Sequence, residues 1–426
     1  MIIFGAIFAL VIGVILSLAL RSLKLSAPFG MSLLLPLCFI LNIETVLLVL
    51  IVMDYVTSFD RTLHAAESRS ADINLQIAGL SSILIVFSLT AFQFYIDKVQ
   101  FLALCVFSIT AVICFQALIM PIPSDNKLRK PRILSLFLSM LSAITGLTIP
   151  TIGMDVGTGI QRYSMGITEL YGGIDFTVIV LGLCCLGEIL YSVSIQFTDN
   201  GYGTQNSVVC GARQTAGLLQ TAIRRPYFKV AEILLAATLG IPLSQASAII
   251  VGTFALYGSQ FPNPIRFLFY NFNEAYTVAL ISVIYIILLY AVPMLSKRMP
   301  GIPHKDRPAR AMSKNTDFNT EESNKLMSPV AFYPILTVAA FVGVYSIHYR
   351  LFDIYLLIAF GVAGFIMRRL NFPITPLLVC AAFSYRIEEA YRAPFSWTYL
   401  TAVFYLLSCV VLAIYIKMAF KPDGND

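Results

Sequence analysis

The chain has 426 residues, of which 58% are hydrophobic and 12% are charged. A soluble globular domain carries about 25% charged residues, so this chain has too few charges to cover a surface exposed to water. The composition therefore excludes an ordinary soluble protein and predicts an all-α polytopic membrane protein. The net charge of +6 does not call for nucleic acid, because basic residues at the ends of membrane spans are the expected orientation signal.

About 10–12 apolar segments follow one another, and most approach the roughly 20 residues that a helix needs to cross a bilayer. The first is too long for a signal peptide and is expected to be an uncleaved span. In chain order the candidate spans are Ile2–Leu20, Met31–Met53, Leu75–Tyr95, Phe101–Met120, Ile133–Ile152, Ile174–Gln196, Phe228–Tyr257, Ala275–Ser296, Pro329–Tyr349, Phe352–Met367, Ile374–Ile387 and Trp397–Met418.

Lysines and arginines gather in connections between these segments, at 127–132, 213–229, 297–325 and 368–369. The positive-inside tendency places all four groups in the cytoplasm, and the polar stretch 300–328 is expected to be a cytoplasmic linker. We interpret residues 1–426 as one transmembrane domain with a first half, 1–196, and a second half, 197–426. The chain is expected to lie in a membrane as a multi-pass protein.

The segment Phe228–Tyr257 carries Gly240 and Pro242 inside an apolar run. Pro242 removes a backbone donor and Gly240 permits an unwound conformation, so the helix is expected to open at 239–243. It would restart near Ser244, which is placed to cap it. A helix start inside a membrane protein attracts an anion such as a carboxylate, and Ser247 adds a second hydroxyl. A simple proline kink is the alternative, and both interpretations stay open here.

A similar but shorter pattern occurs near the N-terminus, where Ser26, Pro28 and Gly30 precede the interrupted run Met31–Met53. Broken segments in corresponding halves of a membrane protein point to a transporter binding site. We therefore predict a site for a small anionic substrate between the two breaks, and a two-fold internal repeat is left open. The candidate substrate-binding residues are Gly240, Pro242, Ser244 and Ser247, with Ser26, Pro28 and Gly30 opposite them.

Several acidic residues lie in or beside apolar runs. Glu188 has two interpretations, a site for a cation or proton and an interfacial group paired with a nearby cation. Glu388 and Glu389 are interpreted as a pair that closes a helix at the interface, or as a functional pair. Glu44 is a candidate for binding a coupling cation. The sequence contains no phosphate loop, no nucleophile–base motif and no metal-ligand spacing, so we expect neither an enzyme nor a cofactor.

Three segments carry a family resemblance. The segment 153–190, GMDVGTGIQRYSMGITELYGGIDFTVIVLGLCCLGEIL, resembles a signature of the large membrane subunit of tripartite tricarboxylate transporters. The segments 367–392, MRRLNFPITPLLVCAAFSYRIEEAYR, and 238–258, TLGIPLSQASAIIVGTFALYG, are similar to two further patterns of that family. The first signature falls on Asp155, Gly159, Arg162, Tyr163, Gly166, Glu169, Leu170, Gly173, Ile174, Asp175 and Phe176.

The resemblance implies secondary import of an organic dicarboxylate or tricarboxylate, driven by a Na⁺ or H⁺ gradient. It also implies two partners, a small membrane subunit and a periplasmic solute-binding protein. The chain departs from the family in its signature loops, where Arg69 and Arg225 stand in place of asparagines and Leu243 replaces a glycine. We predict that one or both arginines contact an anion, with plain orientation charges as the alternative. A second function class is a paralogue that keeps the fold without transport, or with another specificity.

Overall fold

The structure is a computed structural model, and it describes residues 11–19, 26–39, 43–65, 98–119, 131–155, 158–199, 226–239, 241–256, 332–392 and 398–420. All structural statements below concern these residues. The candidate spans Leu75–Tyr95 and Ala275–Ser296 lie outside them, as do Gly240, Arg69, Arg225 and the linker 300–328.

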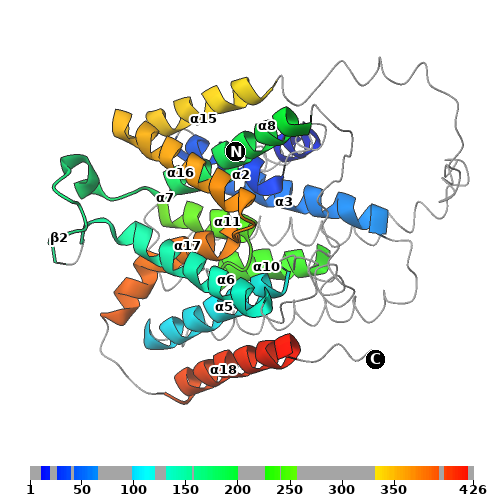
Figure 1. Ribbon diagram of the computed structural model, residues 1–426, viewed down its shortest axis with the longest axis vertical. Helices are drawn as coiled ribbons and strands as arrows, with labels where there is room; N and C mark the ends of the chain where they lie inside the picture. The colour runs from blue at the N-terminus through cyan, green and yellow to red at the C-terminus, as the bar shows by residue number, and fades with distance from the viewer. Residues whose placement is uncertain are drawn as a thin grey trace, which may run out of the picture.

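The described residues are almost entirely helical (Figure 1). Residues 11–19 form a first helical segment. Two short antiparallel strands form a hairpin, in which Gly153 pairs with Arg162. The further elements are α2 (Ala27–Leu34), η1 (Leu35–Phe39), α3 (Ile43–Ala65), α5 (Lys98–Ile119), α6 (Pro131–Thr148), η3 (Ile149–Thr151), β1 (Gly153–Met154), β2 (Gln161–Arg162), η4 (Thr168–Gly172), α7 (Phe176–Val180), the π-helix η5 (Leu181–Leu186), α8 (Gly187–Asp199), α10 (Pro226–Leu239), α11 (Gln245–Leu256), α15 (Tyr333–His348), α16 (Leu351–Arg369), α17 (Ile374–Tyr391) and α18 (Tyr399–Phe420).

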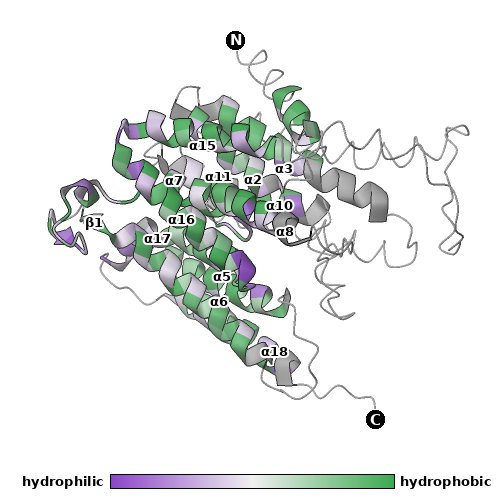
Figure 2. Cartoon of the chain, turned by 45° about the horizontal axis from the view of Figure 1, so that its top comes forward, coloured by the Kyte–Doolittle hydropathy of each residue, from purple (hydrophilic) through white to green (hydrophobic). Residues whose placement is uncertain are grey.

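The expectation of an all-α membrane protein is confirmed, with the small hairpin as an addition. Four helical stretches in the described part are long and apolar enough to cross a membrane: Val99–Leu118, Leu134–Thr151, Phe176–Ser194 and Leu351–Arg369. The helices carry mostly hydrophobic residues along their length (Figure 2). Both interrupted runs depart from a regular helix, since the first changes from α2 to the 3-10 helix η1 at Leu35, and residues 241–244 between α10 and α11 are not helical.

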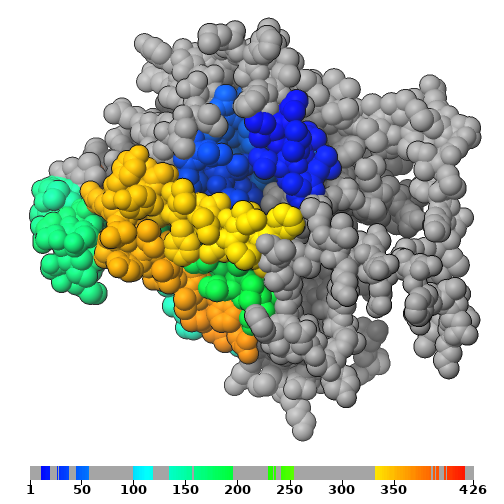
Figure 3. Space-filling view, turned by 90° about the horizontal axis from the view of Figure 1, so that it is seen from above, coloured from blue at the N-terminus to red at the C-terminus, as the bar shows by residue number. Residues whose placement is uncertain are grey.

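The core is formed by α3, the α7–η5–α8 helix, α11 and α17. Leu50 of α3, Leu181 of η5, Ile249 of α11 and Leu378 of α17 are fully buried within one apolar cluster. α15 and α16 lie along one face of the molecule, next to the N-terminal residues (Figure 3). The broken helices α2 and α11 are therefore in the interior, where polar groups at their ends must find partners within the protein.

Two helix pairs approach each other very closely at glycines. A Cβ atom on Gly146 of α6 would lie 2.2 Å from the carbonyl oxygen of Leu377 on α17. A Cβ atom on Gly364 of α16 would lie 2.9 Å from the carbonyl oxygen of Leu183 in the π-helix. Small residues at such crossings let helix backbones pack together in a membrane protein.

The hairpin projects beyond the helices, on the left in Figure 1. Gly153 and Gly173 hold its base, with positive φ angles of 126° and 79°, and a Cβ atom on Gly153 would lie 2.6 Å from the Cα atom of Gly173. These conformations and this approach favour glycine. The segment carries exposed apolar side chains, among which Met165 is 91% exposed.

The orientation of the hairpin can be tested by labelling. The span Leu134–Thr151 separates the hairpin from the basic residues 127–132, so the positive-inside tendency places the hairpin outside the cytoplasm. We expect Met165→Cys to react with a membrane-impermeant maleimide in intact cells, and Ser313→Cys to react only after lysis. The unmodified chain is the control, because Cys409 is exposed. The reverse labelling pattern would overturn this orientation.

Candidate functional site

The break between α10 and α11 is larger than one unwound turn. A helix rises about 1.5 Å per residue, so Lys229 and Leu239 are about 15 Å apart along α10. Ser244 nevertheless lies next to Lys229, with 3.5 Å between its hydroxyl and the Lys229 Nζ atom. The amide of Ile241 also donates to the carbonyl of Leu235, at 3.5 Å. The chain therefore folds back along α10 before α11 begins. The predicted opening of the helix is confirmed, and the simple proline kink is wrong.

Ser244 caps α11, as the sequence predicts. Its hydroxyl accepts from the amide of Ser247 at 3.4 Å, and the Ser247 hydroxyl accepts from the amide of Ser244 at 2.9 Å. The Ser247 hydroxyl also accepts from the amide of Leu243 at 3.0 Å. This is the reciprocal arrangement of a capping box, with serine as the third helical residue. The cap satisfies the amides that Pro242 and the break leave outside a regular helix; the Pro242 side chain itself is buried.

A buried group of charges lies against this helix start. Glu232 accepts a hydrogen bond from the Ser247 hydroxyl at 2.7 Å. The Lys229 Nζ atom is 2.9 Å from the other Glu232 oxygen and 3.6 Å from a carboxylate oxygen of Asp54 on α3. The side chains of Lys229, Asp54 and Glu232 are 14%, 5% and 7% exposed. Figure 2 shows hydrophilic residues in α10 between helices that are otherwise hydrophobic. We call Asp54, Lys229, Glu232, Ser244 and Ser247 the α11 cluster.

The α11 cluster has a definite electrostatic character. Two carboxylates and one ammonium leave it with one net negative charge when all three groups are ionised. The carboxylate at the start of α11 belongs to Glu232, so the chain itself supplies the anion that a helix start favours. Lys229 is one of the basic residues interpreted from the sequence as orientation charges. In the structure its ammonium group points toward Glu232 and Asp54. Whether Ser244 and Ser247 also contact a substrate stays a prediction.

The start of α2 has a related set of contacts. Ser26 caps the helix by accepting from the amide of Phe29 at 3.3 Å, and Pro28 stands in the first turn. The hydroxyl and the amide of Ser26 donate to the two oxygens of Glu188, at 2.6 and 3.1 Å. Glu188 also lies 3.4 Å from a guanidinium nitrogen of Arg368. The interpretation of Glu188 as a group paired with a nearby cation is therefore confirmed.

The two broken helices contact each other in the interior. α2 packs against α11, and both pack against α3. Each start combines a capping serine, a glutamate and a basic side chain, although the polar groups of the two starts have separate partners. Gly30 is buried on α2, and its amide donates to the carbonyl of Ser26 at 3.4 Å. The structure thus brings together the two helices that the sequence analysis pairs.

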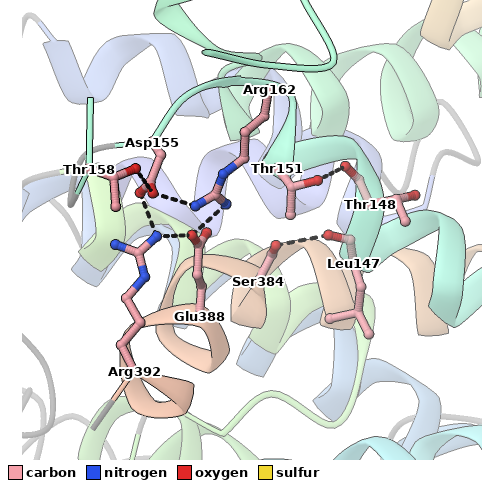
Figure 4. A network of polar contacts seen from close by, with 9 residues as sticks. All are labelled: Leu147, Thr148, Thr151, Asp155, Thr158, Arg162, Ser384, Glu388 and Arg392. Atoms are coloured by element: carbon pink, nitrogen blue, oxygen red, sulfur yellow. Dashed lines mark hydrogen bonds and ion pairs between the residues drawn. The ribbon is translucent and has the colours of Figure 1, made fainter. Parts of the chain in front are cut away.

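A third group of charges fastens the hairpin to α17 (Figure 4). Glu388 accepts from Arg162 of β2 at 2.6 Å and also pairs with Arg392. Asp155, which follows β1, pairs with Arg162 and with Arg392, at 2.5 Å for the second pair. The hydrogen bond with Glu388 raises the pKa of Arg162 above its usual value. The position of Glu388 near the end of α17 agrees with the interpretation of a helix-closing interfacial residue.

Two important residues escaped the sequence analysis. Glu232 stands in the apolar run Phe228–Tyr257, and Asp54 directly follows the run Met31–Met53. The argument applied to Glu188, that a carboxylate within an apolar segment faces the protein interior, would have found both. The side chains of Glu44 and Glu389 lie outside the described part, so their predicted roles stay predictions.

A family model described as "Tripartite tricarboxylate transporter TctA family" matches residues 73–229 and 326–379. The first matched segment contains the hairpin and ends at Lys229, and the second begins at residue 326, so the break itself is not part of the match. An uncharacterized 52.8 kDa protein in the TAR-I ttuC' 3' region of Agrobacterium vitis is 22% identical over 351 residues. That alignment covers 66% of this chain and 64% of the relative, less than two thirds of the relative's length. No solved structure matches the chain.

Proposed function

The chain belongs to the tripartite tricarboxylate transporter TctA family, and from this premise we propose that it is the permease subunit through which an organic carboxylate crosses the bacterial inner membrane. The substrate class is a dicarboxylate or tricarboxylate. Import is driven by a gradient of Na⁺ or H⁺. The expected partners are a small membrane subunit and a periplasmic solute-binding protein.

One observation carries the proposal: two helices with capped starts, α2 and α11, contact each other inside a membrane protein. Interrupted helices are tolerated in membrane proteins where they are buried or line a cavity, and transporters use them to bind substrates and ions. Charged residues at both starts add to this support, buried Glu232 and Asp54 at α11 and the partly buried Glu188 and Arg368 at α2, because such groups are expensive in a membrane protein and usually functional. We assign the substrate path to the region between Ser26 and Ser244.

The test is uptake into proteoliposomes that contain the chain and the small subunit, with the binding protein added outside. A panel of labelled monocarboxylates, dicarboxylates and tricarboxylates is offered under a Na⁺ gradient, a H⁺ gradient or none. We expect uptake that needs both the binding protein and a gradient. Ser26→Ala and Ser247→Ala should each lower it about tenfold through lost hydrogen bonds. Ser346→Ala is the matched control, because that hydroxyl donates to a carbonyl of its own helix, at 2.8 Å.

A second candidate function has its own support. The hydroxyls of Ser26 and Ser247 already donate to carboxylates of the chain, Glu188 and Glu232. This arrangement favours a membrane paralogue that keeps the fold without transport, or that takes a substrate other than a carboxylate. A complex that assembles but takes up no carboxylate under any gradient would reject the first proposal and favour this one.

A further inference from the structure

Three oxygen atoms of described residues lie around the Lys229 ammonium group. Around the Nζ atom are a Glu232 oxygen at 2.9 Å, the Ser244 hydroxyl at 3.5 Å and an Asp54 oxygen at 3.6 Å. These groups come from α10 itself, from the start of α11 and from α3, so the ammonium lies where three parts of the chain meet. Carboxylate and hydroxyl oxygens are also the ligands that hard metal cations prefer.

Two of the three oxygen ligands, those of Glu232 and Ser244, are held by bonds that do not depend on Lys229. The Ser247 hydroxyl fixes one oxygen of Glu232 at 2.7 Å and is itself fixed by the amides of Leu243 and Ser244. Ser244 is fixed as the helix cap, through the amide of Ser247. Removal of the ammonium would therefore leave the Glu232 and Ser244 oxygens in place and take one positive charge from among them.

We propose that the Lys229 ammonium is a built-in cation that fills a site for a monovalent metal ion, Na⁺ or K⁺, at the start of α11. The ammonium supplies one positive charge, and one alkali ion would restore the same net charge. Mg²⁺ or Ca²⁺ would bring one positive charge more than the ammonium, which favours a monovalent ion. The unmodified chain consequently needs no alkali ion at this position.

The test is a gain of cation binding in Lys229→Ala, measured as thermal stability of the purified protein in detergent. Apparent Tm is compared in equal concentrations of NaCl, KCl and choline chloride. We expect the unmodified chain to differ less among the three salts than Lys229→Ala does, since a coupling ion bound elsewhere would act on both proteins alike. Lys229→Ala should have a lower Tm in choline chloride and gain on the order of 5 °C in NaCl or KCl, because an ion that binds only the folded state stabilises it. This readout needs no transport, so it stands or falls separately from the proposed function.

Two controls separate the site from general salt effects. Lys229→Arg keeps the charge and should respond to the three salts as the unmodified chain does. Arg369→Ala removes an exposed basic side chain at the end of α16 and should also respond as the unmodified chain does. The double variant Lys229→Ala/Glu232→Gln keeps one carboxylate of the cluster, that of Asp54. It replaces Lys229→Ala in the test if repulsion between the two carboxylates prevents Lys229→Ala from folding.

The outcomes are distinct. A rise in Tm in NaCl or KCl over choline chloride, in Lys229→Ala or in the double variant, supports the built-in cation. Folding of Lys229→Ala only when alkali ions are present supports it equally. Equal Tm values in the three salts for both variants would overturn the proposal. So would a selective stabilisation of the unmodified chain by Na⁺ or K⁺ as large as that of Lys229→Ala, because the ammonium would then not fill the site.

Discussion

Glu232→Ala is expected to lower the free energy of unfolding by about 3 kcal/mol, because it leaves the buried Lys229 ammonium without its nearest carboxylate. The Ser247 hydroxyl loses its acceptor in the same variant. Asp54 remains 3.6 Å from the Lys229 Nζ atom and limits the loss. The measurement is the apparent Tm of detergent-solubilised protein, followed by the fraction that stays monodisperse on gel filtration after heating.

Two further variants make the result specific. Glu232→Gln keeps an acceptor for Ser247 and loses only the charge, so its stability should lie between those of Glu232→Ala and the unmodified chain. Glu169→Ala removes an exposed carboxylate near the hairpin and should change stability by less than about 0.5 kcal/mol. A Glu232→Ala protein as stable as the Glu169→Ala protein would show that the α11 cluster does not hold the fold together.

Gly146→Ala is expected to cost about 3 kcal/mol by forcing α6 away from α17. The new Cβ atom would lie 2.2 Å from the carbonyl oxygen of Leu377, and backbone atoms cannot turn aside as a flexible side chain can. Adding a methyl group to a fully packed interface costs about 1–3 kcal/mol and occasionally more. The same heating and gel-filtration measurement checks the effect.

Gly172→Ala is the matched control for this variant. A Cβ atom there would meet only the end of the Arg350 side chain, at 3.2 Å, and that side chain can move. We expect a change of less than about 0.5 kcal/mol. If Gly146→Ala is as stable as Gly172→Ala, the close crossing of α6 and α17 is contradicted.

Local features of the sequence predicted the elements well. A proline after a glycine in an apolar run indicates an interrupted helix, because Pro242 removes a backbone donor, although the pattern left a break and a simple kink both open. The following serine, Ser244, was correctly predicted as the cap, since capping depends on a hydroxyl close to the amides it accepts from. The helix formed around Glu188 and the helix that ends near Glu388 were likewise predicted from hydrophobicity alone.

The sequence pattern does not predict which polar groups contact one another. Ser26 and Glu188 are separated by 162 residues, and Ser247 meets Glu232 only because the chain folds back along α10. Spacing within a helix says nothing of such contacts, which depend on how helices pack. The hairpin was missed for another reason: its strands have two residues each, too short to show an alternating pattern.

Helix α17 connects the hairpin at one end with the start of α11 at the other. Its last turns hold the hairpin through Glu388 and Arg392, and Thr375 in its first turn accepts a hydrogen bond from Gln245, the first residue of α11, at 3.2 Å. With 18 residues, α17 is a rod about 27 Å long. The hairpin cannot tilt without breaking its ion pairs or carrying this rod with it. A force applied to the exposed end of the hairpin would therefore be transmitted through α17 to the start of α11.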